Sequence, residues 1–223
     1  MYRRKKQKIS VVEPFEKPVS GTFSIVARSP ESGLFGVAVA SGSLSVGDRV
    51  PHAKPGVGVV ATQAYTNVAY GTKGLELMGR GMLPREVLDR ILKEDLGRES
   101  RQVAMVDAKG NKAVFTGRRV PGWCGESIGK DYIVIGNLLA GREVVDNMAE
   151  EFERSAGDLA WRIVRALEAA SESGGDRRGE RSAALLVAGA RSVEVEVMVN
   201  EHSAPIKELN RRLGSHFRAR CST

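Results

Sequence analysis

The sequence predicts an α+β fold in which two antiparallel sheets each carry helices on their outer side. Predicted strands come in blocks separated by pairs of predicted helices, whereas a doubly wound parallel sheet would alternate them singly. The run Leu34 to Ser41 (LFGVAVAS) is continuously apolar, as expected of a strand buried on both faces. The turn sequence Ala108 to Asn111 joins two short apolar segments and predicts an antiparallel hairpin.

The elements follow from periodicity along the chain. Alternation or short apolar runs bounded by turn residues predict strands over 22–28, 34–41, 58–62, 102–107, 112–116, 132–135, 183–188 and 193–199. Apolar residues at helical spacing predict helices over 73–80, 84–93, 143–153, 158–170 and from about residue 205 onward. Pro84 suits a first helical turn, and Asp158 is expected to cap the helix that follows it.

Composition divides the chain into a basic N-terminal extension, residues 1–21, and one domain, residues 22–223. The extension holds six Lys or Arg against two Glu and shows no periodicity, which is typical of a loosely attached segment. The 42% apolar content supports a sizeable core in the domain. We find neither a membrane-spanning apolar run nor the apolar stretch of a signal peptide. With only Cys124 and Cys221, the chain excludes a disulfide scaffold and fits the reducing cytoplasm.

The net charge of +7 is concentrated at the ends of the chain. The extension accounts for +4 of it, and further arginines lie on the last predicted helix: Arg211, Arg212, Arg218 and Arg220. Only 5% of residues are aromatic, so few side chains are available to stack on bases. Nucleic-acid binding is therefore the least favoured function. The same helix carries a stripe of leucines, which could serve an interface in a homo-oligomer.

Two sequence motifs match known sites only in their letters. Gly125 to Gly129 (GESIG) has the pattern of a nucleophile elbow, but a strand-like segment follows it where the elbow needs a helix. Gly56, Gly58 and Ala61 match part of a dinucleotide fingerprint, but they run into a predicted strand instead of opening a helix. We reject both sites.

Other chemistry-bearing residues give weaker signals. The segment Gly174 to Gly179 (GGDRRG) has backbone and guanidinium groups that suit an anion, or it is simply a flexible turn. Cys124 has no histidine near it in sequence, which favours an ordinary partly buried thiol. The histidines at 52, 202 and 216 are scattered without metal-ligand spacing. We expect no metal and no cofactor.

The junction of Gly21 and Thr22 has a specific chemical meaning. An N-terminal threonine carries its own base, because a free α-amine has a pKa near 8 and can accept the proton of the hydroxyl. Thr22 is internal, so this chemistry requires cleavage after Gly21 or a start of translation closer to Thr22. Gly21 suits self-cleavage, since a residue without Cβ tolerates the strained backbone of an acyl shift.

Four long segments carry a family resemblance: 22–47 (TFSIVARSPESGLFGVAVASGSLSVG), 56–78 (GVGVVATQAYTNVAYGTKGLELM), 136–141 (GNLLAG) and 174–187 (GGDRRGERSAALLV). They resemble the prokaryotic family called domain of unknown function 1028, which is grouped with the N-terminal-nucleophile (Ntn) hydrolases. The resemblance implies a four-layer αββα sandwich. Family members commonly begin with Met-Thr-Phe-Ser, so loss of Met exposes the threonine that matches Thr22. This chain departs from the family in its 21 extra residues and in Glu180, where a glutamine is more usual.

The candidate site residues follow from the resemblance and from strand ends. Thr22 is the candidate nucleophile, and Ser41, at the end of the neighbouring hairpin strand, is a candidate proton relay. Asn67 and Asn137 are candidate oxyanion donors at strand ends. In the family-like segments, Gln63, Asp176 and Arg178 are candidates for orienting the substrate or the amine. For each of these secondary residues, a purely structural hydrogen bond is the alternative.

Three functions remain open from the sequence. The first is hydrolysis of a small-molecule amide through Thr22. The second is a binding protein that keeps the Ntn fold without the chemistry, which the extension and the missing glutamine favour. The third is nucleic-acid binding through the basic extension.

Overall fold

The computed structural model describes residues 21–220. Apart from Gly21, the predicted N-terminal extension and Cys221 lie outside these residues. Within them the chain forms two antiparallel sheets and five α-helices, as the element order predicted. The larger sheet has the strand order β10-β9-β2-β1-β8-β7. Its strands are β1 (Thr22–Ser29), β2 (Leu34–Ser41), β7 (Trp123–Ile128), β8 (Tyr132–Leu139), β9 (Ser182–Ala188) and β10 (Val193–Val199).

The smaller sheet has the strand order β3-β4-β5-β6. Its strands are β3 (Pro51–Lys54), β4 (Gly58–Ala64), β5 (Arg101–Asp107) and β6 (Lys112–Thr116). The predicted hairpin joins β5 and β6, where Gly110 adopts a φ of 90° and the Asp107 carboxylate accepts the backbone N–H groups of Lys109 and Asn111. Short 3₁₀ turns, Val46–Asp48 and Arg98–Ser100, precede β3 and β5.

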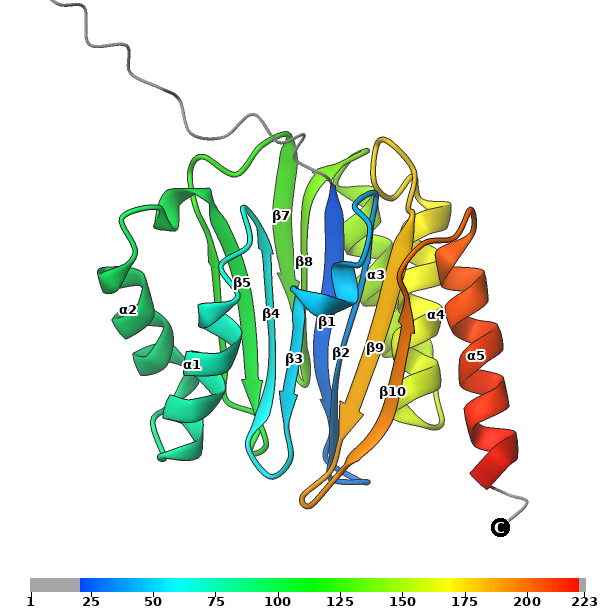
Figure 1. Cartoon of the computed structure of the whole chain (residues 1–223), viewed down its shortest axis with the longest axis horizontal. Helices are drawn as coiled ribbons and strands as arrows, with labels where there is room; N and C mark the ends of the chain where they lie inside the picture. Colours follow the sequence, from blue (N-terminus) through cyan, green and yellow to red (C-terminus); the bar gives the residue numbers. More distant parts are fainter. Residues whose placement is uncertain (1–20, 221–223) are drawn as a thin grey trace, which may run out of the picture.

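The helices lie on two sides of the pair of sheets (Figure 1). On the smaller sheet pack α1 (Ala69–Gly79) and α2 (Pro84–Glu94). On the larger sheet pack α3 (Glu143–Arg154), α4 (Leu159–Glu172) and α5 (Pro205–Arg220). Pro84 begins α2 as predicted, and the carboxylate of Asp158 accepts the Ala160 N–H at 2.8 Å, which confirms the predicted cap of α4.

Side-chain alternation on β1 determines what each of its residues faces. Phe23 and Ile25 belong to the core between the larger sheet and its helices. Val26 belongs to a second core between the two sheets, together with Val59 and Ala104 from the smaller one. Since Thr22 and Ser24 alternate with Phe23 and share the face of Val26, their side chains point toward the smaller sheet. The first residue of the domain therefore lies between the sheets at one end.

The observed elements correspond to the predicted ones with four larger differences. Two strands, β3 and β7, were not predicted, α1 begins at Ala69, four residues before the predicted start, and β8 ends at Leu139, four residues after the predicted end. The rejection of the nucleophile elbow is supported, because Gly125 lies within β7 and no helix follows the motif. The dinucleotide fingerprint is likewise absent, since Gly58 begins β4.

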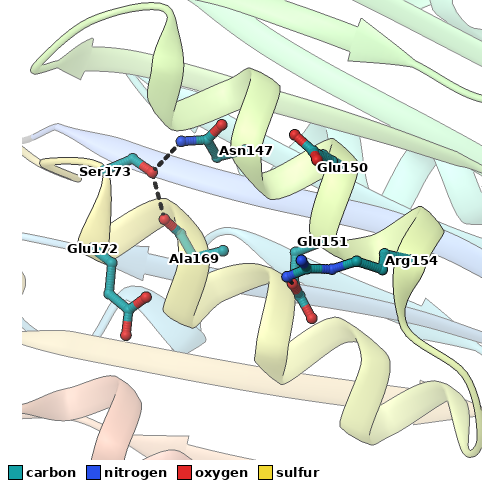
Figure 2. Close-up of a pocket in the computed structure, with 7 residues that line it drawn as sticks. All are labelled: Asn147, Glu150, Glu151, Arg154, Ala169, Glu172 and Ser173. Carbon is teal, nitrogen blue, oxygen red and sulfur yellow. Dashed lines mark hydrogen bonds and ion pairs between the residues drawn. The ribbon is translucent and has the colours of Figure 1, made fainter.

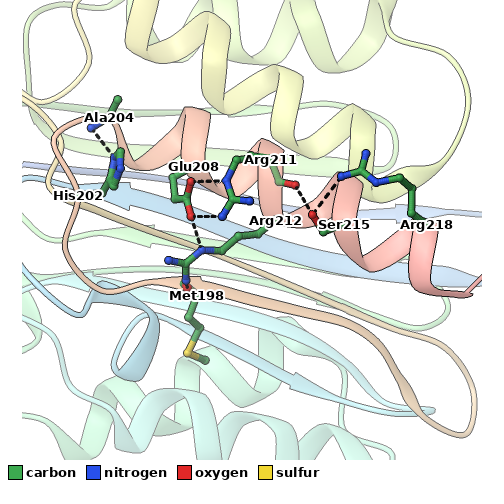
Figure 3. Close-up of polar contacts among 8 residues, drawn as sticks. All are labelled: Met198, His202, Ala204, Glu208, Arg211, Arg212, Ser215 and Arg218. Atoms are coloured by element: carbon green, nitrogen blue, oxygen red, sulfur yellow. Dashed lines mark hydrogen bonds and ion pairs between the residues drawn. The ribbon is translucent and has the colours of Figure 1, made fainter.

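The last helix uses its apolar stripe within the chain. Ile206, Leu209 and Leu213 are buried against the larger sheet. On its outer side, the Glu208 carboxylate accepts hydrogen bonds from both Arg211 and Arg212 (Figure 3). The leucines of this stripe are therefore covered within the chain, and part of the basic charge is paired. None of the helices among residues 21–220 has the length and apolar character to cross a membrane.

Candidate functional site

A row of polar side chains crosses the larger sheet at one end. Thr22 is paired in register with Ser41 on β2 and with Asn137 on β8. The row continues to Ser182 on β9 and to Cys124 on β7. Paired residues of antiparallel strands point to the same face, so Thr22, Ser41, Asn137 and Ser182 all face the smaller sheet. All four are buried, which is unusual for neighbouring polar groups unless they are hydrogen-bonded.

Ser41 joins the Thr22 hydroxyl to the carbonyl of the preceding residue. Thr22 Oγ1 and Ser41 Oγ are 3.0 Å apart, and Ser41 Oγ donates to the Gly21 carbonyl oxygen at 2.6 Å. A hydroxyl has a single proton to donate. Ser41 therefore accepts the Thr22 proton, and it also accepts the Ser43 N–H at 3.1 Å. A continuous path leads from the Thr22 hydroxyl through Ser41 to the Gly21 oxygen.

Buried amides hold Thr22 from the side of the smaller sheet. Gln63, on β4, donates to the Thr22 carbonyl at 3.1 Å and to Gln102 Oε1 at 2.8 Å. Its own carbonyl accepts from Ser24 Oγ at 2.6 Å, and its amide nitrogen lies 3.3 Å from Asn137 Oδ1. All of these side chains are fully buried. Gln63 thus bonds to Thr22, Ser24 and Asn137 of the larger sheet and to Gln102 of the smaller one, so these hydrogen bonds join the two sheets at this end.

Gln102 completes this network from β5. Its amide nitrogen lies 3.0 Å from the Gly136 carbonyl, 3.2 Å from the Gly125 carbonyl and 3.1 Å from Thr116 Oγ1. Sequence reasoning missed Gln102, Ser24 and Ser182. A signal existed for Ser24, which stands two residues after Thr22 and therefore on the same face. Gln102 had only the weak signal of an amide opening an apolar strand.

Asp176 lies beside Gly21 and is the buried carboxylate of the site. Its side chain accepts the Gly42 N–H at 2.7 Å and the Arg178 N–H at 3.0 Å. The Arg178 guanidinium lies 3.6 Å from the carboxylate and is itself partly exposed. The loop also forms an isolated bridge from Asp176 to Leu139 on β8. Asp176 and Arg178 are therefore brought to the end of β1.

Glu180, where the family more usually has glutamine, supports this loop. Its carboxylate accepts the Asp176 N–H at 3.0 Å and the Ser171 hydroxyl at 3.0 Å. The two contacts use different oxygens of Glu180, Oε1 for the Asp176 N–H and Oε2 for the Ser171 hydroxyl. A glutamine has a single side-chain oxygen, which can accept the Asp176 N–H, and its NH2 group would have to donate to Ser171 Oγ instead. The contact that holds Asp176 is therefore compatible with either residue.

Asn67 occupies a different place from the other predicted residues. Its Oδ1 accepts the Ala69 N–H at the start of α1, and its Nδ2 lies 3.5 Å from Asp95. Its backbone oxygen accepts from Thr62 Oγ1. These contacts tie the β4–α1 loop to α1 and α2. The structure therefore brings Thr22, Ser41, Gln63, Asn137, Asp176 and Arg178 together, while the contacts of Asn67 belong to the loop.

Backbone strain marks the same end of the sheets. Among residues 21–220, three non-glycine residues have positive φ: Ser45 (49°), Ala64 (66°) and Leu138 (52°). Ala64 directly follows Gln63, and Leu138 directly follows Asn137. Such conformations cost about 1–3 kcal/mol each and gather at functional sites. Ala64 and Leu138 therefore add conformational strain next to the buried amides of Gln63 and Asn137.

Other candidate groups lie outside this end or have ordinary roles. Burial and the Glu126 charge raise the pKa of Cys124, whose thiol is directed at the Val120 carbonyl, so it is a poor nucleophile. A polar pocket of about 380 Å³ lies between α3 and α4, where Asn147 donates to Ser173 (Figure 2). Among the described residues, no group of three or more His, Cys, Asp or Glu is arranged to hold a metal ion.

The comparisons with known proteins concern the whole domain. The model of a family of unknown function, DUF1028, matches residues 22–209. The chain belongs to this family. A crystal structure of a DUF1028 protein from Silicibacter pomeroyi is 33% identical, with a TM-score of 0.82 over 87% of this chain and 88% of that one. DUF1028 membership thus confirms the family resemblance seen in the sequence, and the solved relative shares the fold.

A second solved structure is more distant. Anbu (ancestral beta-subunit) from Yersinia bercovieri is 13% identical over 90% of this chain and 97% of that one, with a TM-score of 0.40. That similarity is too low to bear on fold or activity. No curated protein matches the chain.

Proposed function

We propose that this DUF1028 protein is an N-terminal-nucleophile hydrolase that cleaves a small amide through Thr22, after the bond between Gly21 and Thr22 has been cut. The observation that carries the proposal is the Ser41 hydroxyl, which contacts both the Thr22 hydroxyl and the Gly21 carbonyl oxygen. The arrangement of helices outside two facing sheets supports assigning the chain to the αββα sandwich of that superfamily. Fold alone does not determine function, so the proposal rests on the site.

Self-cleavage begins with attack of Thr22 Oγ1 on the Gly21 carbonyl carbon. The Thr22 proton passes to Ser41, and the Ser41 proton passes to the Gly21 oxygen, which becomes the hydroxyl of a tetrahedral intermediate. Collapse restores the carbonyl, breaks the bond to the Thr22 nitrogen and transfers the hydroxyl proton to that nitrogen. Water then hydrolyses the resulting ester, giving a Gly21 carboxylate and a free Thr22. Ser41 thus acts as general acid and base in one relay.

Turnover of a substrate repeats this acyl transfer with the free amine present. A neutral α-amine, with a pKa near 8, accepts the hydroxyl proton as Thr22 attacks the substrate amide. Asn137 is our candidate donor to the developing oxyanion, because it is the register partner of Thr22. Gln63 holds the Thr22 backbone, and Asp176 with Arg178 orients the new amine or the substrate. We place Asn67 in support of the loop.

The test of this role is replacement of the nucleophile. We expect Thr22→Ala to abolish both cleavage and amide hydrolysis, and Thr22→Ser to retain both, since serine keeps the hydroxyl. An acylating inhibitor should label Thr22 in the processed protein, as mass spectrometry of peptides will show. Hydrolysis that persists in the purified Thr22→Ala protein would sink the assignment.

A second candidate function is small-molecule binding without catalysis. It is favoured by the buried Gly21, whose carbonyl accepts the hydrogen bond of the Ser41 hydroxyl. As long as the bond between Gly21 and Thr22 is intact, Thr22 has no free amine. Tight binding of a metabolite by protein with an intact Gly21–Thr22 bond would support it. Labelling of Thr22 by the acylating inhibitor would exclude it. In either case a small molecule is the partner we propose, and a cytoplasmic location and a homo-oligomer stay predictions.

A further inference from the structure

The carboxylate of Asp176 lies where a side chain on residue 21 would have to be. An ideal Cβ built on Gly21 would be 2.5 Å from Asp176 Cγ and 2.6 Å and 2.8 Å from its two oxygens. These distances are shorter than any relaxed contact between such atoms. An L residue other than glycine at position 21 therefore requires Asp176 to move.

Hydrogen bonds and close packing hold the Asp176 side chain in place. Its oxygens accept the Gly42 and Arg178 N–H groups, and its own N–H donates to Glu180. On the far side, Gly42 is packed just as closely, since a Cβ there would be 2.6 Å from Asp176 Oδ2. The side chain is fully buried. Moving the carboxylate would break charge-assisted hydrogen bonds, which are the stronger kind.

The α-carbon of Gly21 marks where the acyl group of a substrate lies. In self-cleavage the Gly21 carbonyl carbon becomes esterified to Thr22 Oγ1. In turnover the carbonyl carbon of the substrate becomes esterified to the same oxygen, so its α-carbon occupies the same neighbourhood. The contact between Asp176 and Gly21 therefore also acts on the substrate.

We infer that Asp176 restricts the acyl side of the site to groups with no L substituent on the α-carbon, so that the substrates are glycyl-type amides. The inference rests on the proposed function, because it needs an acyl group on Thr22. Asp176 is a specificity-determining residue here, and it acts through volume.

The experiment compares two substrates on protein that begins at Thr22, produced from a start codon placed directly before it. The probes are glycyl and L-alanyl amides of 7-amino-4-methylcoumarin, followed by fluorescence. We expect kcat/KM for the glycyl amide to exceed that for the L-alanyl amide by at least about tenfold, as expected when one methyl group meets a closed pocket. Equal hydrolysis of both probes would overturn the inference and leave the proposed function standing. Hydrolysis of neither probe, together with no acylation of Thr22, would remove the proposed function and the inference with it.

Matched variants separate volume from charge. Asp176→Ala opens the space and should bring the two kcat/KM values close together, whereas Asp176→Asn keeps the volume and should keep the preference. Asp89→Ala, on the exposed side of α2, should leave the ratio unchanged. A ratio that is lost in Asp176→Asn would contradict a volume effect.

A readout without catalysis tests the contact itself. In uncleavable Thr22→Ala protein, Gly21→Ala should lower the midpoint of urea unfolding, and the same change should cost less when Asp176→Ala is also present. Purely additive effects of the two substitutions would contradict the contact.

Discussion

At the scale of single residues, Ser41 is the side chain on which the proposed self-cleavage depends. Its one proton is donated to the Gly21 oxygen, so its lone pairs are left for the Thr22 hydroxyl and the Ser43 N–H. Ser182, one strand away in the same row, bonds through its hydroxyl to backbone groups of the loop after β2, the Ser43 carbonyl and the Val46 N–H. The two serines thus share burial and register but differ in what they contact.

Replacing each serine with alanine distinguishes a proton-relay role from a purely structural role. Ser41→Ala should slow cleavage after Gly21 by about 100-fold, the usual contribution of one general acid–base group. Ser182→Ala should leave that rate unchanged, although both substitutions cost about 1–2 kcal/mol of unfolding free energy by leaving buried groups unpaired. Time courses of intact mass and urea unfolding measure the two effects. Equal cleavage rates in the two variants would argue against a relay.

The buried amide Gln63 makes a prediction about stability. Gln63→Leu removes the acceptor of Ser24 and the donor to Gln102, and it should destabilise the protein by about 2–4 kcal/mol in urea unfolding. Adding Ser24→Ala should recover part of this loss, because one orphaned hydroxyl is then gone. A double variant no more stable than Gln63→Leu alone would show that the hydroxyl is not the source of the cost.

The sequence predicts part of this site for a clear reason. Thr22 and Ser41 stand at the two ends of a hairpin, and a hairpin with a short turn has only one register that keeps its apolar residues buried. That is why the distance between them was predictable. Gln63 and Asn137 come from strands further along the chain. Gln63 was predicted from a family-like segment, and Asn137 from its place at a predicted strand end. Gln102 was missed because its partners, Gln63, Thr116 and backbone carbonyls of β7 and β8, lie on other strands, and no spacing along the chain reveals them.

At the scale of elements, a cluster around Asp95 ties α1, α2 and β5 together. Burial alone would raise the pKa of Asp95, but hydrogen bonds from Arg101, Tyr70 and the Gly97 N–H outweigh it and hold the pKa well below its usual range. Burial of the Tyr70 hydroxyl, its hydrogen bond to Asp95 and the charge of Asp95 raise the pKa of Tyr70. Arg101 also donates to the Tyr65 carbonyl, so the cluster holds the loop that follows Gln63.

This cluster predicts how stability depends on pH. A carboxyl whose pKa is lower in the folded chain contributes stability that is fully present above its unfolded pKa, near 3.9, and is lost as pH falls below it. Unfolding free energy should therefore fall between about pH 5 and pH 2, and less steeply in Asp95→Asn than in the wild type. Asp89→Asn, a largely exposed control on α2, should follow the wild type. Parallel pH profiles for Asp95→Asn and wild type would contradict the role of Asp95.

Two strands could not be predicted because local pattern does not specify them. The strand β3 has four residues and begins with Pro51, which a strand tolerates at its first position but which normally signals a turn. The strand β7 lies at the edge of the larger sheet and contains Gly125 among polar residues. Both exist because a long neighbouring strand, β4 or β8, presents unpaired backbone groups to them.

At the scale of the whole molecule, the two sheets have an apolar middle and a polar end. Valines and alanines fill most of the space between them, and the network of Thr22, Ser41, Gln63, Gln102 and Asn137 closes one end. The two antiparallel sheets with helices outside them were predictable, because the predicted strands come in blocks separated by pairs of helices. The hydrogen bonds that join the two sheets at the polar end were not, since they depend on how strands distant in sequence face each other.

The proposed hydrolase requires that Thr22 becomes an N-terminal residue. This is measured by the intact mass of the protein purified after expression of all 223 residues, combined with N-terminal sequencing. We expect a chain that begins at Thr22, and a full-length chain in Thr22→Ala. A wild-type protein that stays at full length and still hydrolyses amides would contradict the role of Thr22.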